Sequence, residues 1–195
     1  MFEHLPSPTI FAHRGASGYA PENTLAAFDL AARQGAPAIE LDAKLSADGQ
    51  VVVIHDQSVD RTTQGQGKVR EMSLEQLKQL DAGSFFDSGF AGERIPTLDE
   101  VFASVGTRVF INVELTNYAT PVDVLPRKVA ALVRKHNLEK SVMFSSFNPL
   151  ALVRIRHLLP ECPIGLLALP GLLARARQSL RHVVEGGDQV PHLVA

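Results

Sequence analysis

Two histidines and an arginine in this sequence stand where they could transfer protons on an anionic substrate. His13 and Arg14 follow a short β-rich run, and His55 closes a second apolar run. Histidine titrates near neutral pH, so a pair of histidines can act as general base and general acid. Arginine presents a planar fork of donors that matches a phosphate or a carboxylate. These residue types together favour acid–base chemistry on an anion.

Three carboxylates accompany this group. Glu40 and Asp42 are two residues apart in an expected strand, so both side chains project from the same face. Glu114 lies in a later expected strand, and strands flanked by helices normally bury both faces. Buried carboxylates need a partner, and an oxygen-rich pocket of this kind suits Ca²⁺ or Mg²⁺. A metal, an acid–base pair and an anion clamp together indicate metal-assisted phosphoryl chemistry.

Hydrophobic periodicity predicts the strands and helices that must position these residues. Strands are expected over residues 9–12, 38–45, 108–115, 141–147 and 164–169, with one more strand start at 189–193. Helices are expected over residues 21–35, 98–105, 122–136, 149–159 and 172–184. Such alternation is typical of a parallel α/β sheet, in which functional residues gather at the ends of the strands.

Residues 46–96 interrupt this alternation. A turn over 46–50 leads to an apolar run at 51–54. This turn is shorter than the roughly twelve residues that a parallel crossover needs. We therefore expect 51–54 to pair antiparallel with the preceding strand. Residues 57–96 are rich in glycine and polar residues, with one short helix near 73–80. Excursions of this length in compact domains are often lids or binding loops.

The number of strands leaves two architectures open. The sequence predicts five full parallel strands and the start of a sixth, whereas a closed (β/α)₈ barrel needs eight strands and typically ~250 residues. The chain has 195 residues. It is therefore either an open α/β sheet or a (β/α)₈ TIM-type barrel truncated after about five to six parallel strands.

Composition excludes several classes of protein. Hydrophobic residues make up 45% of the chain, enough to bury a core, which excludes wholesale disorder. Lys and Arg number 19 against 21 Asp and Glu, a net charge of −2, so we expect no nucleic-acid partner. The single cysteine, Cys162, excludes an intramolecular disulfide and a cysteine-based zinc site.

Targeting signals are weak. The first residues lack the basic start and uninterrupted apolar core of a secretory signal. The longest apolar stretch, residues 164–173, is interrupted by Gly165, Pro170 and Gly171, and it is far short of the ~20 residues that span a bilayer. We therefore expect no stable membrane insertion and, by default, a cytoplasmic location.

An ordered set of motifs extends over roughly residues 9–170. It comprises HRG at 13–15, PENTLAAF at 21–28, IELDAKLSADGQVVVIHD at 39–56, DRTTQGQG at 60–67, IPTLDEV at 95–101, NVELT at 112–116 and SSF at 145–147. In this combination the sequence resembles the glycerophosphodiester phosphodiesterase family. The resemblance implies a single (β/α)₈-barrel domain over residues 1–195, incomplete at its C-terminus, with a small insertion at about 57–96.

The resemblance also implies an activity and a division of roles. Members of this family cleave glycerophosphodiesters into sn-glycerol 3-phosphate and an alcohol. By motif, the three carboxylates named above correspond to ligands of a divalent metal, Ca²⁺ or Mg²⁺. His13 and His55 correspond to the acid–base pair and Arg14 to a phosphate contact. In the implied mechanism a glycerol hydroxyl attacks phosphorus, and water then opens the cyclic phosphate with the histidine roles reversed.

Two departures from the family pattern stand out. Many members carry a lysine two residues after the third carboxylate, and this chain has Thr116, which can still donate a hydrogen bond to the substrate. The family's last strands, with their Trp-Thr-Val-Asn motif, have no counterpart here, since the chain contains no tryptophan. Those strands usually close the barrel and supply one wall of the pocket.

Two alternatives stay open at this point. The chain could be a related phosphodiesterase acting on lysophospholipids or phosphoinositol-type head groups. It could also be an inactive truncated fragment that retains the metal site. An open barrel would expose two sheet edges, through which copies of the chain could associate as homo-oligomers.

Neighbouring polar residues allow more than one interpretation. Asp56 could orient His55 or be a plain turn residue. Arg61 is expected mainly to hold the base of the excursion in place. Glu22 and Asn23 are expected to organise the start of the first helix, from which Asn23 could still reach the site.

Overall fold

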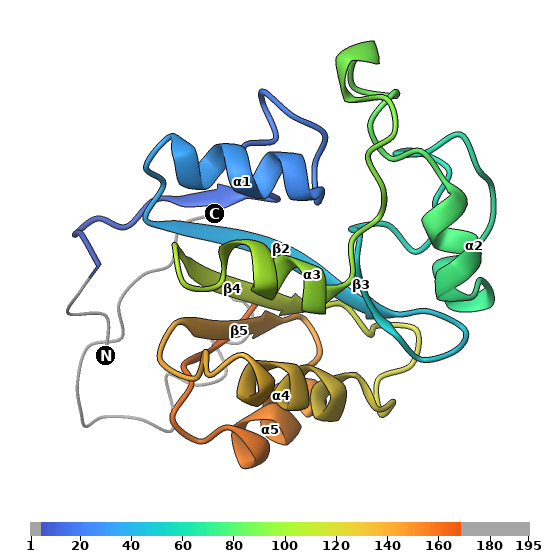
Figure 1. Cartoon of the computed structure of the whole chain (residues 1–195). Helices are drawn as coiled ribbons and strands as arrows, with labels where there is room; N and C mark the ends of the chain where they lie inside the picture. Colours follow the sequence, from blue (N-terminus) through green and yellow to red (C-terminus); the bar gives the residue numbers. More distant parts are fainter. Residues whose placement is uncertain (1–4, 169–195) are drawn as a thin grey trace.

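In a computed structural model that describes residues 5–168, a parallel sheet carries its helices on one face (Figure 1). The parallel strands are Phe11–His13 (β1), Ala38–Leu45 (β2), Phe110–Leu115 (β4), Val142–Ser146 (β5) and Ile164–Leu166 (β6). Val51–Val53 (β3) pairs antiparallel with β2, as the short turn before it predicts. The expectations at 172–184 and 189–193 lie outside the described residues.

The helices alternate with the parallel strands. They are Leu25–Arg33 (α1), Leu74–Gln79 (α2), Leu98–Val105 (α3), Leu125–Lys135 (α4) and Pro149–Leu158 (α5), with short 3₁₀ turns at Val69–Glu71 (η1) and Ser88–Phe90 (η2). Both β2 and α3 have the bounds expected for them, and most other expected elements differ from the observed ones by one to three residues at their ends.

Strand order decides between the two architectures that the sequence leaves open. The parallel strands follow one another in chain order, β1-β2-β4-β5-β6, without the reversal that marks a doubly wound open sheet. Consecutive helices contact each other, α1 with α3, α3 with α4 and α4 with α5, so all four lie on one side. One-sided winding in chain order is the arrangement of a (β/α)₈ barrel. The described residues supply five of its parallel strands.

Alternation along the strands separates an apolar face from a polar one. The helix-facing side chains of β2 and β4 join the main core, which also contains buried residues of α1, α3, α4 and α5. Side chains between them along the same strands face the barrel interior, as expected from the period of two. Every residue of β2 except Leu45 is buried, so its polar residues are buried with its apolar ones.

Parallel register brings those interior polar residues side by side. Glu40 pairs with Asn112 across β2 and β4, and Asp42 pairs with Glu114. Glu114 in turn pairs with Ser145 on β5. Paired residues of adjacent strands point to the same face, so one polar row crosses three strands.

The first helix begins later than the sequence predicts. Residues 21–24 were expected to be helical, but Asn23 has a φ of 57°, in the left-handed region that a right-handed helix cannot include. Thr24 then caps the helix by accepting a hydrogen bond from the N–H of Ala27. Helix α1 therefore starts at Leu25, and the residues before it form a connection beside the site.

The excursion after β3 packs around its own small core. Buried residues of β3 and the excursion form a second cluster: Val52, Ile54, Val59, Val69, Leu77, Ala82 and Ile95. Helix α2 begins with a capping box formed by Ser73 and Gln76. Figure 1 shows this segment beside β3, at one end of the sheet. It is a packed segment and not an extended loop.

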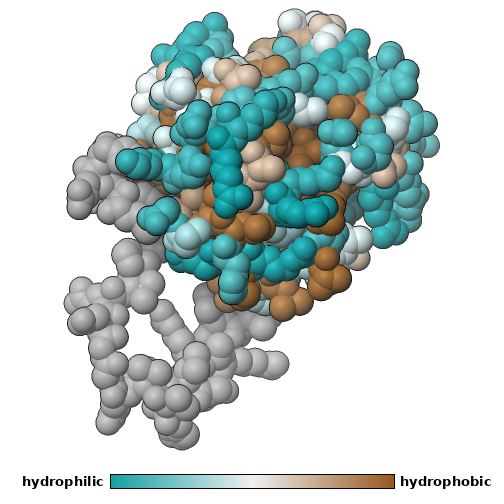
Figure 2. All heavy atoms as spheres, turned by 60° about the horizontal axis from the view of Figure 1, so that its bottom comes forward, coloured by the Kyte–Doolittle hydropathy of each residue, from teal (hydrophilic) through white to brown (hydrophobic). Residues whose placement is uncertain are grey.

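The surface is mostly hydrophilic with scattered apolar residues. Figure 2 brings forward the face at the bottom of Figure 1, where α4 and α5 lie, and shows hydrophobic patches among hydrophilic residues. Leu150 and Val153 on α5 and Leu166 on β6 are at least half exposed. Among the described residues, every helix is too short or too polar to cross a membrane.

Candidate active site

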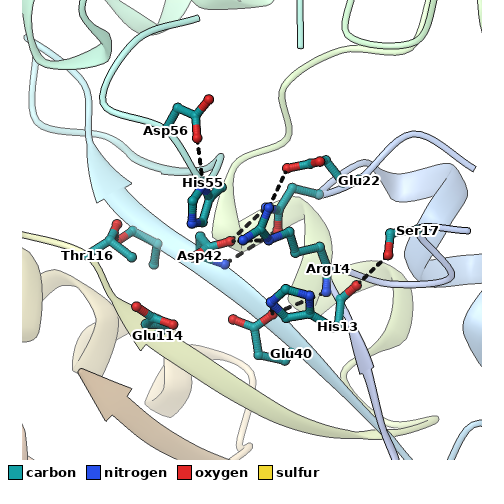
Figure 3. Close-up of polar contacts among 12 residues, drawn as sticks. His13, Arg14, Ser17, Glu22, Glu40, Asp42, His55, Asp56, Glu114 and Thr116 are labelled. Atoms are coloured by element: carbon teal, nitrogen blue, oxygen red, sulfur yellow. Dashed lines mark hydrogen bonds and ion pairs between the residues drawn. The ribbon is translucent and has the colours of Figure 1, made fainter. Parts of the chain in front are cut away.

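Three carboxylates converge where β2 lies beside β4, as the sequence predicts. Glu40, Asp42 and Glu114 each place a carboxylate oxygen within 4.8 Å of the other two (Figure 3). The strand register explains this convergence, because Asp42 and Glu114 are direct partners and Glu40 lies two residues earlier on the same face. Figure 3 shows His13 beside Glu40 and His55 on the side of Asp42.

The carboxylate cluster suits a divalent cation. One oxygen of Glu40, Oε1, is buried and has no hydrogen-bond partner among the described residues. Burial, reinforced by the charges of Asp42 and Glu114, raises the pKa of Glu40 to about 9. Burial likewise raises the pKa of Glu114. A cluster of buried anions with an unsatisfied oxygen is costly alone, and oxygen ligands are those that Ca²⁺ and Mg²⁺ prefer. The residues present therefore fit a hard divalent ion.

The chain turns sharply after β1, which aims His13 and Arg14 at these carboxylates. Arg14 has a φ of 59°, a left-handed conformation that costs a non-glycine residue about 1–2 kcal/mol. Its backbone N–H donates to the main-chain oxygen and to the carboxylate of Glu40, at 3.1 Å each, which holds the turn. The His13 ring lies 3.7 Å from the same carboxylate. Partial burial, with the charge of Arg14, lowers the pKa of His13.

The Arg14 guanidinium lies between two carboxylates. Its Nη1 donates to Glu22 at 3.0 Å, and its Nε lies 3.5 Å from Asp42. Within the described part of the chain, no hydrogen bond occupies Nη2. Arg14 therefore keeps a free donor group for an anion, as expected of a phosphate contact.

His55 is oriented by the residue that follows it. Its Nδ1 lies 2.6 Å from Asp56 Oδ1. A hydrogen bond from Arg61 lowers the pKa of Asp56 to about 2, so Asp56 is ionised and can only accept. Nδ1 must then carry the proton, which leaves Nε2 to exchange one. Of the two interpretations of Asp56, the geometry supports the orienting one.

A buried lysine fixes the backbone around His55 through hydrogen bonds. Lys44 Nζ donates to the carbonyls of His55 and Asp56, at 2.6 and 2.8 Å. Burial lowers the pKa of Lys44 to about 8. Lys44 follows Asp42 by two residues on the same strand face, a spacing visible in the sequence, but its role as an anchor was not expected.

Glu22 and Asn23 reach the site instead of entering the helix. Asn23 Nδ2 donates to Asp42 Oδ2 at 2.9 Å, while Glu22 accepts hydrogen bonds from Arg14 and Arg61. The expectation that Glu22 organises the helix start is therefore wrong, because the helix begins at Leu25. Asn23 reaches the site, as the sequence allowed.

A tyrosine contacts the third carboxylate, and sequence reasoning missed it. The Tyr118 hydroxyl donates a hydrogen bond to Glu114 Oε1. Its ring packs edge-on against Phe147, with centroids 5.9 Å apart. The position of Tyr118, four residues after Glu114 in the loop beyond β4, is the only sequence signal for this contact.

Thr116 lies at the end of β4 but does not offer the expected hydrogen bond. Its hydroxyl donates to the carbonyl of Ala43 at 2.9 Å, and the residue is buried. The side-chain proton is used within the sheet, so the geometry does not support a direct substrate contact. Thr116 instead lines a cavity of about 190 Å³, together with residues that include Lys44, Gln57 and Arg70.

Comparison with known proteins identifies a common family. A model of the "Glycerophosphoryl diester phosphodiesterase family" matches residues 13–186. A glycerophosphodiester phosphodiesterase of Caldanaerobacter subterraneus is 44% identical over 173 residues, which is 88% of this chain and 71% of the relative.

Solved structures show the same relationship. A glycerophosphodiester phosphodiesterase from Agrobacterium tumefaciens superimposes with a TM-score of 0.73 at 41% identity, over 80% of this chain and 65% of that one. A phosphodiesterase from Oleispira antarctica, solved in complex with the product sn-glycerol-3-phosphate, gives a TM-score of 0.80 at 36% identity. That match covers 92% of this chain and 74% of the other. This chain thus spans about two thirds to three quarters of these proteins.

Proposed function

This chain belongs to the glycerophosphoryl diester phosphodiesterase family, and on that premise we propose that it hydrolyses glycerophosphodiesters to sn-glycerol 3-phosphate and an alcohol. The substrate is a small molecule, and the reaction depends on a divalent metal and two histidines. The product-bound relative supports the substrate class. The proposal treats the chain as one domain with the insertion at about 57–96.

One observation carries the proposal: Glu40, Asp42 and Glu114 bring their oxygens within 4.8 Å of one another, with two imidazoles nearby. These carboxylates would hold the cation, Ca²⁺ or Mg²⁺, both of which prefer oxygen ligands. When bound, such an ion polarises a phosphoryl oxygen and offsets the negative charge that develops there. Glu40 Oε1, to which no described residue donates a hydrogen bond, supplies a ligand atom.

The side chains around the cluster supply binding and proton transfer. Arg14 directs its free Nη2 at a phosphate oxygen, while Glu22 and Asp42 fix the guanidinium. His55 presents Nε2, because Nδ1–H donates to Asp56. His13 lies on the other side of the cluster, beside Glu40.

The two histidines exchange protons with the substrate and with water in two steps. In the first, one histidine takes the proton of a glycerol hydroxyl as its oxygen attacks phosphorus. The other histidine protonates the leaving alcohol oxygen as that P–O bond breaks. Water then attacks the cyclic phosphate and opens it, with both histidines in reversed roles. Each histidine ends the cycle in its starting protonation state.

Product analysis tests this function. The purified chain would be incubated with Mg²⁺ or Ca²⁺ and a panel of diesters: glycerophosphocholine, a lysophospholipid and glycerophosphoinositol. We expect sn-glycerol 3-phosphate and free choline from the first, at the highest rate of the three. Faster release from either of the others would replace the substrate class with one of the alternatives. No product from any diester, by a folded chain with metal, would leave an inactive fragment as the better description.

A further inference from the structure

An arginine of the insertion links the residues that hold Arg14 and His55. Arg61 follows β3 at the start of the insertion. Its Nη1 and Nη2 donate to the two oxygens of Glu22, at 2.8 Å each. Its Nε and Nη2 donate to the two oxygens of Asp56, at 2.7 and 3.3 Å. One guanidinium thus makes two bidentate contacts, the strongest geometry for this pair of groups.

Each of these carboxylates holds a functional side chain as well. Glu22 accepts a hydrogen bond from Arg14 at 3.0 Å, and Asp56 lies 2.6 Å from the ring of His55. The five side chains form one connected chain, in which guanidinium and carboxylate groups alternate and the His55 imidazole stands at one end. Arg61 is its centre, and no other described residue contacts both carboxylates through its side chain.

The contacts of Arg61 exceed what the insertion needs to fold. The same stretch is held by other hydrogen bonds: the Thr63 hydroxyl donates to the Val59 carbonyl at 2.7 Å, and the Gly67 N–H donates to Asp60 at 2.9 Å. Val59 itself is part of the small apolar core. The Arg61 side chain is 46% exposed, and exposed ion pairs add little to stability. A purely structural role would not need a bidentate contact with both Glu22 and Asp56.

From this geometry we propose that Arg61 is a positioning residue, which fixes the His55 ring through Asp56 and the Arg14 guanidinium through Glu22. The proposal rests on the proposed function for its effect on turnover, but not for its effect on the His55 ring. Without Arg61, Asp56 loses two of its hydrogen bonds and is free to turn away from Nδ1. The ring then no longer holds its proton on Nδ1 alone, and Nε2 is not reliably the exchanging nitrogen.

Nuclear magnetic resonance of the imidazole tests the link without any assay of activity. At about pH 8.5, a ring proton that is hydrogen-bonded to a carboxylate gives a downfield signal, which His55→Gln identifies by its loss. We expect this signal in the wild-type chain and in Arg94→Gln, and its loss in Arg61→Gln. Arg94 is a matched control because it is exposed, lies in the same insertion and, among residues 5–168, makes one side-chain hydrogen bond, to the carbonyl of Gln79.

Kinetics of the same variants test the consequence for turnover. We expect Arg61→Gln to lower kcat by about 10- to 100-fold, the usual effect of losing a residue that orients a catalytic group. Arg61→Lys keeps the positive charge but cannot make the two bidentate contacts. Its kcat should therefore lie between those of the wild type and Arg61→Gln. Thermal midpoints should stay within a few degrees of wild type, and if Arg61→Gln does not fold, Arg61→Lys carries the test.

The outcomes separate the two proposals. A His55 signal that persists in both Arg61 variants would overturn the positioning role, whatever the rates. Loss of the signal with unchanged kcat would support the orientation of the ring by Arg61 but overturn its role in turnover. A folded wild-type chain that hydrolyses no diester, but whose His55 signal depends on Arg61, would overturn the proposed function and support the orienting role of Arg61.

Discussion

Asp42 and Glu114 are direct partners in the register of two adjacent parallel strands. Their carboxylates therefore lie side by side because of backbone pairing alone, before any side chain adjusts. Glu40, two residues earlier on the same strand face, completes the cluster. The fold thus assembles a group of like charges that repel one another until a cation binds. This relationship leads to the first two predictions.

Divalent metal should raise the thermal stability of the chain. Binding at the carboxylates stabilises only the folded state, and a ligand at 100 times its Kd adds about 2.7 kcal/mol. A melt in chelator, followed by melts in rising Mg²⁺ or Ca²⁺, measures this. The same midpoint in chelator and in millimolar metal would contradict the assigned ligand set.

Glu40→Gln should separate metal binding from folding. Because burial and the neighbouring carboxylates raise the pKa of Glu40, its ionised form is destabilised in the metal-free protein, and glutamine copies the neutral form. We expect the variant to melt in chelator at or above the wild-type midpoint, but to lose most of the increase with metal. Glu161→Gln, on an exposed turn, should keep the full increase. A large loss of stability in chelator would show that the Glu40 carboxylate is needed for the fold itself.

Each of the two histidines beside the carboxylate cluster should be essential for turnover and dispensable for folding. His13→Ala and His55→Ala should each lower kcat by at least ~10²-fold, as expected when acid–base catalysis is lost. His157→Ala is the matched control, because that residue is exposed and, within the described part of the chain, its ring makes one hydrogen bond, to the carbonyl of Val153. Full activity in either of the first two variants would remove that histidine from the mechanism.

The Arg61–Asp56 pair should stabilise the protein at neutral pH but not in acid. The pKa of Asp56 is about 2 in the folded chain, against about 3.9 for an unperturbed aspartate. A depressed pKa contributes stability above the unfolded value, and this contribution fades as pH falls from about 4 toward 2. Since the pair is partly exposed, we expect Arg61→Gln to cost about 1 kcal/mol at pH 7.

Urea unfolding at several pH values measures the difference in free energy of unfolding between wild type and Arg61→Gln. The difference between wild type and Arg61→Gln should be constant from about pH 6 to 8 and should shrink below about pH 4. Glu22, whose pKa is also lowered chiefly by Arg61, changes in the same direction. A gap that widens in acid would contradict the assigned charges. Arg94→Gln should show no such dependence.

Gly15 should be required for the turn that presents Arg14. Its φ is +82°, and a Cβ there would lie 2.7 Å from the carbonyl carbon of Ala27 in α1. Strain and overlap together should make Gly15→Ala less stable by about 2–4 kcal/mol. Gly18→Ala is the control, because a Cβ at that position has no neighbour within 4 Å. Equal stability of the two variants in urea would mean that the turn tolerates a side chain.

The sequence predicts the sheet and the carboxylate cluster well, because both follow from short-range pattern. The alternation of Glu40 and Asp42 places them on one face, and the short turn before β3 determines its antiparallel pairing. Only the structure established the barrel-type winding, since hydrophobic periodicity does not reveal strand order or which face of the sheet each helix covers.

Contacts between distant segments could not be predicted in the same way. Arg61 and Glu22 are 39 residues apart, and no periodicity relates them. The predicted start of helix α1 lies too early in the sequence, because the left-handed conformation of Asn23 is not visible in a hydrophobic pattern. Thr116 was expected to bind the substrate, but its hydroxyl donates to the carbonyl of Ala43 on the adjacent strand instead, a contact that no pattern in the sequence reveals.

Metal-dependent release of sn-glycerol 3-phosphate from glycerophosphocholine tests the central claim most directly. The rate would be measured in wild type and in Glu114→Gln, first with chelator and then with rising free Mg²⁺ or Ca²⁺. We predict no release in chelator, full recovery of the wild type on adding metal, and a variant that needs more metal for partial recovery. Equal rates with and without chelator, or a variant indifferent to metal, would contradict a catalytic cation held by these carboxylates.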